Sequence, residues 1–225
     1  MSLLKHSLLL ASALICAQSL IGYENQAAAR PTPQQSLQKL IEGNERYSKD
    51  TFEHPNRGQD RRDALTQTQA PFAAVIGCSD SRVSPTLVFD QGVGDIFEVR
   101  VAGNVVGPVV LASLEYSVNV LGSSIILVLG HENCGAVKAV LAGQGNAIEP
   151  IGSKIEAALK EFDKGDHSDT EKAIKANIRY AVQQLRESPS IKKLIADKKV
   201  EVVGGYFHLS TGKVEICCDL PQPAK

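Results

Sequence analysis

The chain has 225 residues, of which 24 are lysine or arginine and 25 are aspartate or glutamate, so its formal net charge at pH 7 is −1. The sequence has no basic block of the kind that binds nucleic acid and no acidic tail typical of a solvated arm. This balance suits a small substrate that is uncharged or singly charged.

The N-terminus has the pattern of a secretory signal peptide. Lys5 precedes an apolar stretch at residues 8–21, and Ala27, Ala28 and Ala29 offer a small-residue cleavage site. The apolar stretch is interrupted by polar residues and is shorter than the ~20 residues of a membrane-spanning helix, so an uncleaved anchor is the less favoured interpretation. We predict export, with cleavage at or near Ala29 and the periplasm as the destination.

Removal of a signal peptide at residues 1–29 leaves 225 − 29 = 196 residues. This length suits one α/β domain with a sizeable core and leaves little room for a second. We therefore predict a single domain over residues 30–225.

Along this domain, segments with helical periodicity alternate with short apolar runs. Helices are expected at residues 34–49, 84–89, 109–120, 135–141 and, with interruptions at 165–166 and 188–189, 151–197. Strands are expected at residues 72–77, 96–101, 124–129, 199–207 and 213–217. The polar stretch at residues 53–63 is expected to be a surface loop.

Continuously apolar strands that alternate with helices predict an α/β fold, with a mostly parallel central β-sheet flanked by helices and an N-terminal helical arm. In such sheets the functional site lies beyond the carboxyl ends of the strands. Cys78 directly follows one predicted strand, and His131 closely follows another. The helix expected from residue 135 keeps Cys134 near His131. These residues therefore predict one site at this edge of the sheet.

Cys78, His131 and Cys134 supply the thiolate and imidazole ligands that zinc prefers in proteins. Three protein ligands with an open fourth position are typical of catalytic zinc. Zinc lowers the pKa of bound water from about 15.7 to about 7, which supplies hydroxide at neutral pH. Asp80 would accept a hydrogen bond from that water or bind zinc itself. A bidentate pair with Arg82 would hold the carboxylate of Asp80 off the metal.

Two alternatives for this cluster stay open at the level of sequence. Cys78 and Cys134 could form a disulfide in an oxidising compartment, although this would leave His131 without a role. A non-catalytic zinc or redox module is the second alternative. Asp80 and Arg82 argue against it, because structural zinc has no need of such a pair.

The remaining cysteines and histidines have simpler interpretations. Cys217 and Cys218 are adjacent near the C-terminus, where ordinary strand packing is favoured over a redox-labile pair or a link between subunits. His54, His167 and His208 are expected to be loop, surface and strand residues and not metal ligands.

The motif CSDSR at residues 78–82, followed by HENCGA at residues 131–136, resembles the β-class carbonic anhydrases. The segment DQGVGDIFEVRVAGN at residues 90–104 is also similar to that family. The resemblance covers the chain from about residue 34 to about residue 217, which is nearly all of the predicted mature protein.

This resemblance implies a zinc enzyme that interconverts carbon dioxide and bicarbonate, with one Zn²⁺ per subunit. It implies a homodimer as the smallest functional unit, often doubled to a homotetramer. The residues that it assigns are the ligands Cys78, His131 and Cys134 and the catalytic dyad of Asp80 and Arg82. A carbon disulfide or carbonyl sulfide hydrolase on the same scaffold is a competing possibility, because those enzymes resemble this family and share its ligands.

The resemblance also implies a substrate pocket. Gln69 would donate a hydrogen bond to a substrate oxygen, while Phe97 and Tyr116 would form an apolar wall suited to carbon dioxide. One subgroup of the family has a bicarbonate-regulated site in which the aspartate binds zinc. The chain has no tryptophan, a residue associated with that regulation, so we expect water and not Asp80 as the fourth ligand near neutral pH.

Overall fold

The computed structural model of the chain describes residues 30–163 and 169–217. The predicted signal peptide, His167 and Cys218 lie outside the described residues. The fold described below is that of the unit spanning Pro31–Lys225. Within the described ranges, no helix has both the length and the apolar character needed to cross a membrane.

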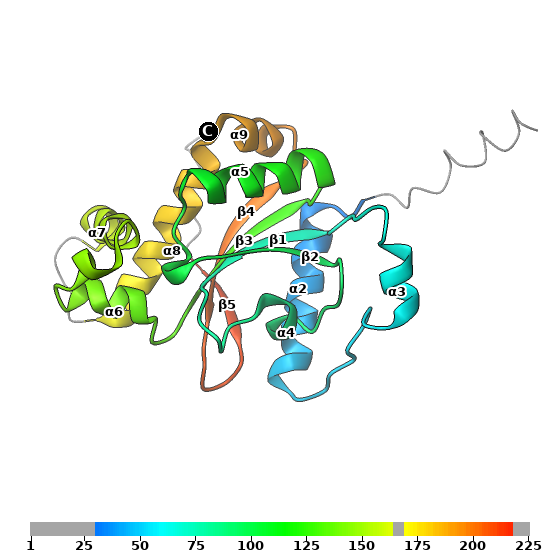
Figure 1. Cartoon of the computed structure of the whole chain (residues 1–225), viewed down its shortest axis with the longest axis horizontal. Coiled ribbons are helices and arrows are strands. Elements are labelled where there is room, and N and C mark those ends of the chain that lie inside the picture. Colours follow the sequence, from blue (N-terminus) through cyan, green and yellow to red (C-terminus); the bar gives the residue numbers. More distant parts are fainter. Residues whose placement is uncertain (1–29, 164–168, 218–225) are drawn as a thin grey trace, which may run out of the picture. The chain divides into compact units, whose positions relative to one another are not determined.

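The centre of the fold is a sheet with the strand order β2-β1-β3-β4-β5 (Figure 1). Its strands are β1 (Ala73–Gly77), β2 (Ile96–Arg100), β3 (Ile125–His131), β4 (Glu201–Phe207) and β5 (Val214–Cys217). The first four pair in parallel, and β5 pairs antiparallel with β4. The antiparallel edge follows from the connection at residues 208–213, which is too short for a parallel crossover. The prediction of a mostly parallel sheet is confirmed.

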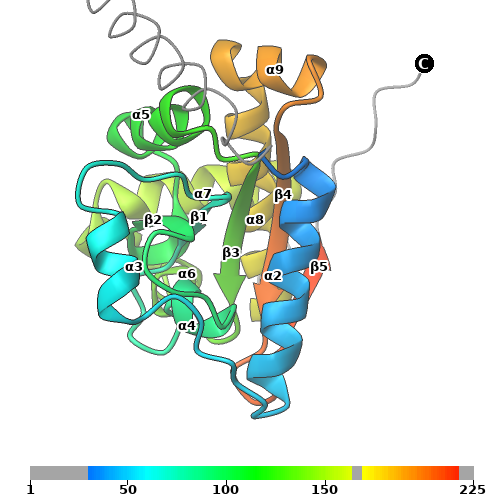
Figure 2. The same cartoon turned by 90° about the vertical axis from the view of Figure 1, so that its right-hand side faces the viewer.

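Helices cover both faces of this sheet (Figure 2). On one face, α2 (Pro33–Ser48) and α4 (Pro85–Val88) bury a core that contains Leu40, Phe89 and Leu127. The other face holds the larger core, which includes Ile76, Ile126 and residues of five helices. These are α5 (Pro108–Tyr116), α6 (Gly135–Leu141), α7 (Ile151–Phe162), α8 (Thr170–Glu187) and α9 (Pro189–Ala196). Helices on both faces explain why the central strands are apolar throughout.

Three short helical turns complete the connections. They are η1 (Ala102–Asn104), η2 (Ser117–Leu121), which continues α5, and η3 (Gly145–Ile148).

The prediction of a surface loop at residues 53–63 is wrong in part, because α3 (Gln59–Ala64) lies at its end. None of the residues of α3 is buried, so the sequence has no apolar periodicity to indicate a helix there. Asp60 in the first turn and two arginines in the last turn stabilise α3 through their interaction with the helix dipole. Arg61 also reaches Asp95, with 2.9 Å between Nη2 and Oδ1.

Strand β3 is longer than predicted. The sequence indicates a strand that ends at residue 129, before Gly130, but the ladder continues to His131, which pairs with Phe207 of β4. Gly130 is required there for packing and not for a turn, because a Cβ at this position would lie 2.6 Å from Ile178. His131 is therefore held by the strand itself.

Candidate metal centre

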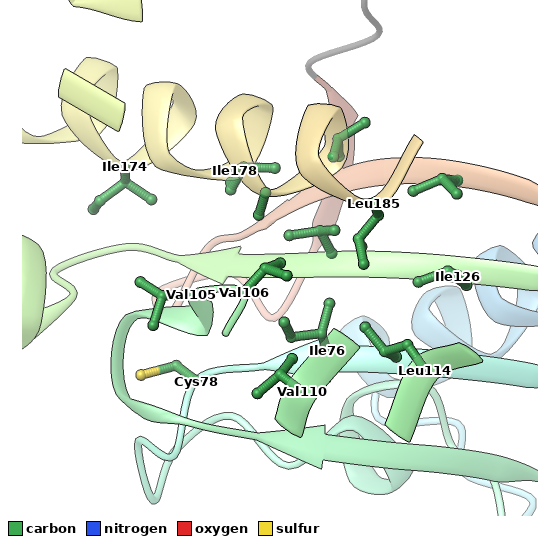
Figure 3. Close-up of a cluster of buried hydrophobic side chains, with 14 of the residues drawn as sticks. Ile76, Cys78, Val105, Val106, Val110, Leu114, Ile126, Ile174, Ile178 and Leu185 are labelled. Carbon is green, nitrogen blue, oxygen red and sulfur yellow. The ribbon is translucent and has the colours of Figure 1, made fainter. Parts of the chain in front are cut away.

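Two neighbouring parallel strands bring the first two ligand candidates together. Gly77 of β1 pairs with Leu129 of β3, so Cys78 and His131 emerge at the same edge of the sheet. Cys78 lies at the margin of the larger core, with Val105 nearby (Figure 3). The ligand atoms of Cys78, His131 and Cys134 all lie within 4.8 Å of one another, and all three residues are buried. The structure thus assembles the cluster that the sequence predicts.

A tight turn returns the chain from His131 to Cys134. Asn133 has a φ of 56°, in the left-handed region that asparagine adopts more readily than most residues. The N–H of Glu132 donates to the carbonyl of Phe207 at 2.8 Å, and its carboxylate accepts from the N–H of Leu209 at 2.9 Å. These bonds fix the turn, so Cys134 reaches the site without a strand of its own.

The imidazole of His131 is oriented with its outer nitrogen toward the cluster. Nδ1 lies 2.9 Å from the carbonyl oxygen of Glu132, which only accepts, so Nδ1 bears the hydrogen in the neutral ring. The lone pair of Nε2 is then available. Nε2 is buried and has no hydrogen-bond partner among the residues that the structure describes. An unpaired buried nitrogen is costly, and a metal ion held by Cys78, His131 and Cys134 would satisfy it.

Close packing also sets the charges of the three side chains. The hydrogen-bonding contact between the two sulfurs lowers the pKa of the Cys78 thiol and, together with burial, raises the pKa of the Cys134 thiol. Burial disfavours protonation of His131, but Cys78, the carbonyl of Glu132 and the charge of Asp80 together raise the pKa of the imidazole. A divalent cation would displace these protons. Both cysteines are free thiols, so the structure does not contain the alternative disulfide.

Asp80 lies beside the cluster and is paired with Arg82. Nε and Nη2 of Arg82 donate to the two carboxylate oxygens at 2.9 and 2.7 Å, and the N–H of Arg82 donates to Oδ1 at 3.0 Å. The hydrogen bonds from the Arg82 side chain hold the pKa of Asp80 well below its usual range. Oδ2 of Asp80 lies 3.8 Å from Nε2 of His131. The bidentate pair expected from the sequence is therefore present, next to the candidate ligands.

Sequence reasoning missed two residues that hold the loop after β1. Arg100, the last residue of β2, donates to the carbonyls of Cys78 at 3.1 Å and Asp80 at 2.7 Å. The N–H of Gly103 donates to Sγ of Cys78 at 3.3 Å. The spacing of the chain gives no signal for Arg100. For Gly103 the signal is the glycine itself, and the structure shows why a glycine is used there, because its φ of 68° is one that glycine tolerates best.

Of the three residues assigned to the substrate pocket, Tyr116 lies near each of the other two. Gln69 and Tyr116 line the same cavity, of about 550 Å³, together with Leu121, and none of the three candidate metal ligands lines it. Gln69 and Leu121 precede the amino ends of β1 and β3, whereas Cys78 and His131 lie at the carboxyl ends of these strands. Phe97 does not line this cavity, but its ring centroid is 6.3 Å from that of Tyr116. Gln69 and Tyr116 are exposed, and Phe97 is half-buried.

The described histidines outside the cluster have other neighbours, and His208 lies one residue beyond the strand in which the sequence places it. His54 lies in the loop after α2, where Nδ1 is 3.6 Å from a carboxylate oxygen of Asp90. His208 follows β4, and its Nε2 is 3.5 Å from Glu215. Cys217 is half-buried against the larger core.

Known proteins are similar to this chain over most of its length. A family model described as "Carbonic anhydrase" matches residues 73–214. A carbonic anhydrase of Mycolicibacterium smegmatis is 38% identical over 191 residues, which cover 82% of this chain and 93% of that protein. The structure of a Coccomyxa β-carbonic anhydrase in complex with acetazolamide is 31% identical, with a TM-score of 0.61, and covers 68% of this chain and 75% of that chain. A chain of the tetrameric β-carbonic anhydrases of Sordaria macrospora is 26% identical, with a TM-score of 0.62, and covers 69% of this chain and 84% of that one.

Removal of a ligand from the cluster is expected to abolish metal binding. We expect Cys78→Ser and His131→Ala to be purified with little or no zinc, because two remaining ligands hold the ion far more weakly. Metal content per chain is measured by atomic emission, and circular dichroism confirms that each variant is folded. Cys217→Ser makes the same chemical change outside the cluster and should retain full metal content. Full zinc content in folded His131→Ala would contradict the assignment.

Proposed function

The chain belongs to the β-class of the carbonic anhydrase family and is a zinc-dependent lyase, and on this premise we propose that it catalyses the reversible hydration of carbon dioxide to bicarbonate and a proton. The observation with the most weight is the unpaired, buried Nε2 of His131, which faces two cysteine sulfurs beside the paired carboxylate of Asp80. This arrangement places a carboxylate that can accept a proton beside a site for a cation.

The proposed ligands are Cys78, His131 and Cys134, a donor set of two thiolates and one imidazole that suits zinc. When bound, zinc lowers the pKa of water to about 7 and so provides a nucleophile for carbon dioxide at neutral pH. The carbonyl of Glu132 fixes the ring of His131, and Gly103 donates to the sulfur of Cys78. These contacts hold the ligands in place before the metal arrives.

Asp80 is proposed as the group that accepts the proton of the reacting water. Its carboxylate lies within 4 Å of a ligand atom, and Arg82 keeps it ionised and directed away from a direct bond to the metal. An ionised carboxylate with a free lone pair orients a water molecule by accepting a hydrogen bond. Near neutral pH, the fourth position is therefore proposed to hold water and not Asp80.

Gln69, Phe97 and Tyr116 are proposed as substrate-binding residues on the strength of the family resemblance, and the cavity that Gln69 and Tyr116 line is not lined by the metal ligands of the same chain. In this proposal the amide of Gln69 donates to a substrate oxygen. The rings of Phe97 and Tyr116, with centroids 6.3 Å apart, provide an apolar wall. A small apolar molecule such as carbon dioxide needs little more than such a wall and one donor.

The functional unit is proposed to be a homodimer, with a homotetramer as its doubled form. Val109 and Tyr116 of α5 and Val120 of η2 are apolar or aromatic and are 81%, 47% and 60% exposed. Several exposed apolar side chains on one helix and its continuation mark an interaction surface. The relatives from Sordaria macrospora are described as tetrameric.

The protein is proposed to act after export, most simply in the periplasm. The support is the sequence pattern of Lys5, the apolar stretch at residues 8–21 and the alanines that end at Ala29.

The reaction and the role of Asp80 are tested together. The purified mature protein should contain about one zinc ion per chain and hydrate carbon dioxide in a stopped-flow assay. Asp80→Ala should keep the zinc but lose about 100-fold or more in kcat, because positioned proton transfer typically contributes 10²–10⁴-fold. Arg82→Ala should also keep the zinc and lose rate, because the carboxylate is then free to approach the metal.

Asp197→Ala is the matched control, since it removes the carboxylate of a surface ion pair with Lys193 and should leave the rate unchanged. Full turnover by Asp80→Ala would show that the proposed role of the dyad is wrong. Hydrolysis of carbonyl sulfide or carbon disulfide without hydration of carbon dioxide would replace the proposed reaction with that of the competing hydrolases. Stoichiometric zinc without any of these activities would indicate a non-catalytic module.

The dimer is tested by sedimentation equilibrium at micromolar concentration. The wild-type protein should have twice the mass of one chain or four times that mass, and Val109→Glu should shift it toward the monomer, because a buried charge opposes association. Lys160→Glu is the control, because it introduces a glutamate on α7, outside the α5 surface, and should leave the mass unchanged. A wild-type protein that sediments as a monomer would contradict the proposal.

Export is tested by N-terminal sequencing of the protein recovered from the periplasm of an expressing bacterium. The expected first residue follows Ala29 or lies near it, because signal peptidase cleaves after small residues. A recovered protein that retains Met1 would refute the proposed cleavage.

A further inference from the structure

Helix α8 contributes no ligand to the metal centre, yet one of its polar residues is buried beside it. Ile174, Ile178 and Leu185 point from α8 into the larger core, to which Cys78 also belongs (Figure 3). The buried residues of α8 are all apolar except Asn177, which is 2% exposed. A buried amide is destabilising unless it is hydrogen-bonded, so its partner indicates what the residue does.

That partner belongs to the loop that contacts a ligand sulfur. Nδ2 of Asn177 donates to the carbonyl oxygen of Gly103 at 2.7 Å. The same glycine donates its N–H to Sγ of Cys78 at 3.3 Å. Because a carbonyl only accepts, the amide of Asn177 has one possible orientation. A continuous path of two hydrogen bonds therefore leads from α8 to the ligand sulfur.

Gly103 depends on such external contacts for its orientation. Its φ of 68° lies in the left-handed region, which glycine tolerates best. A Cβ here would lie 3.0 Å from Cδ1 of Ile155 and 3.3 Å from Cβ of Ala136, which leaves little room for a side chain. With no side chain to anchor it, the residue is held through its backbone groups, and the carbonyl bonded to Asn177 is one of them.

We propose that Asn177 is a positioning residue of the metal centre, which holds Gly103 so that its N–H remains directed at the sulfur of Cys78. The N–H fixes the position of the sulfur and withdraws negative charge from the thiolate, and both effects tune how this ligand binds metal. The inference rests on the proposed zinc site but not on the identity of the reaction.

The test compares two variants that each remove a buried asparagine. Asn177→Leu removes the donor at similar volume. Asn44→Leu removes an asparagine that is 6% exposed and bonds the backbone of Val88, Gly212 and Val214, away from the metal ligands. The full mature protein is used, with zinc affinity measured by competition against a chelator of known affinity. The cobalt-substituted protein provides the absorption spectrum of the thiolate-to-metal charge transfer.

Asn177→Leu should bind zinc about 10- to 100-fold more weakly than the wild type, the usual effect of losing an outer hydrogen-bond partner. Its charge-transfer band should move to longer wavelength, because a sulfur that has lost its N–H donor holds its electrons less tightly. Asn44→Leu should lower the melting temperature at least as much while changing neither readout.

Wild-type affinity and an unshifted band in folded Asn177→Leu would overturn the proposal, and so would equal losses in both variants. If Asn177→Leu does not fold, Asn177→Ser, which adds no bulk, decides the matter by the same readouts. Neither readout requires substrate. A wild-type protein that binds zinc but hydrates no carbon dioxide would therefore refute the proposed function and leave this inference intact.

Discussion

The metal centre depends on one constraint, the parallel pairing of β1 with β3. Their register sets Gly77 opposite Leu129, so Cys78 and His131 arrive at the same edge of the sheet. A slip of one residue would exchange the side chains that face the two cores, and the close packing of both cores opposes it. Once these strands are paired, the left-handed turn at Asn133 is enough to bring the second sulfur back to the site.

Whether the fourth position of this centre stays open to water depends on a competition for the carboxylate of Asp80. A metal ion near Nε2 of His131 would attract it, whereas Arg82 holds it through three hydrogen bonds. Exposed ion pairs contribute little on average, and the Arg82 side chain is 53% exposed. Bidentate geometry makes this pair stronger than most, and the additional bond from the backbone N–H ties the carboxylate to its own turn. Local chain geometry therefore decides the outcome as much as charge does.

The sequence was sufficient to predict the sheet, the two core-facing sets of helices and the ligand cluster, because each is encoded by a local pattern that ends at a recognisable residue. The sequence does not predict helix α3, because that helix buries nothing, and it places His131 beyond β3, because Gly130 resembles a strand terminator. Arg100 and Asn177 donate to backbone carbonyls of the site, and Asn177 lies 74 residues from its partner Gly103. Because every residue has a carbonyl, the sequence does not indicate which one will accept such a bond. Such contacts follow from the assembled fold and have no pattern in the chain. Gln69, Phe97 and Tyr116 were assigned by resemblance alone, and their roles stay predictions.

In the proposed mechanism, Arg82 keeps Asp80 off the metal and leaves the fourth position to water. A crystal structure of the zinc-loaded mature protein, grown near pH 7, distinguishes the two arrangements. We expect a zinc ion bound by Cys78, His131 and Cys134, with a water molecule as its fourth ligand and both carboxylate oxygens of Asp80 still bonded to Arg82. A carboxylate oxygen of Asp80 bound to zinc, with the pair to Arg82 broken, would contradict it.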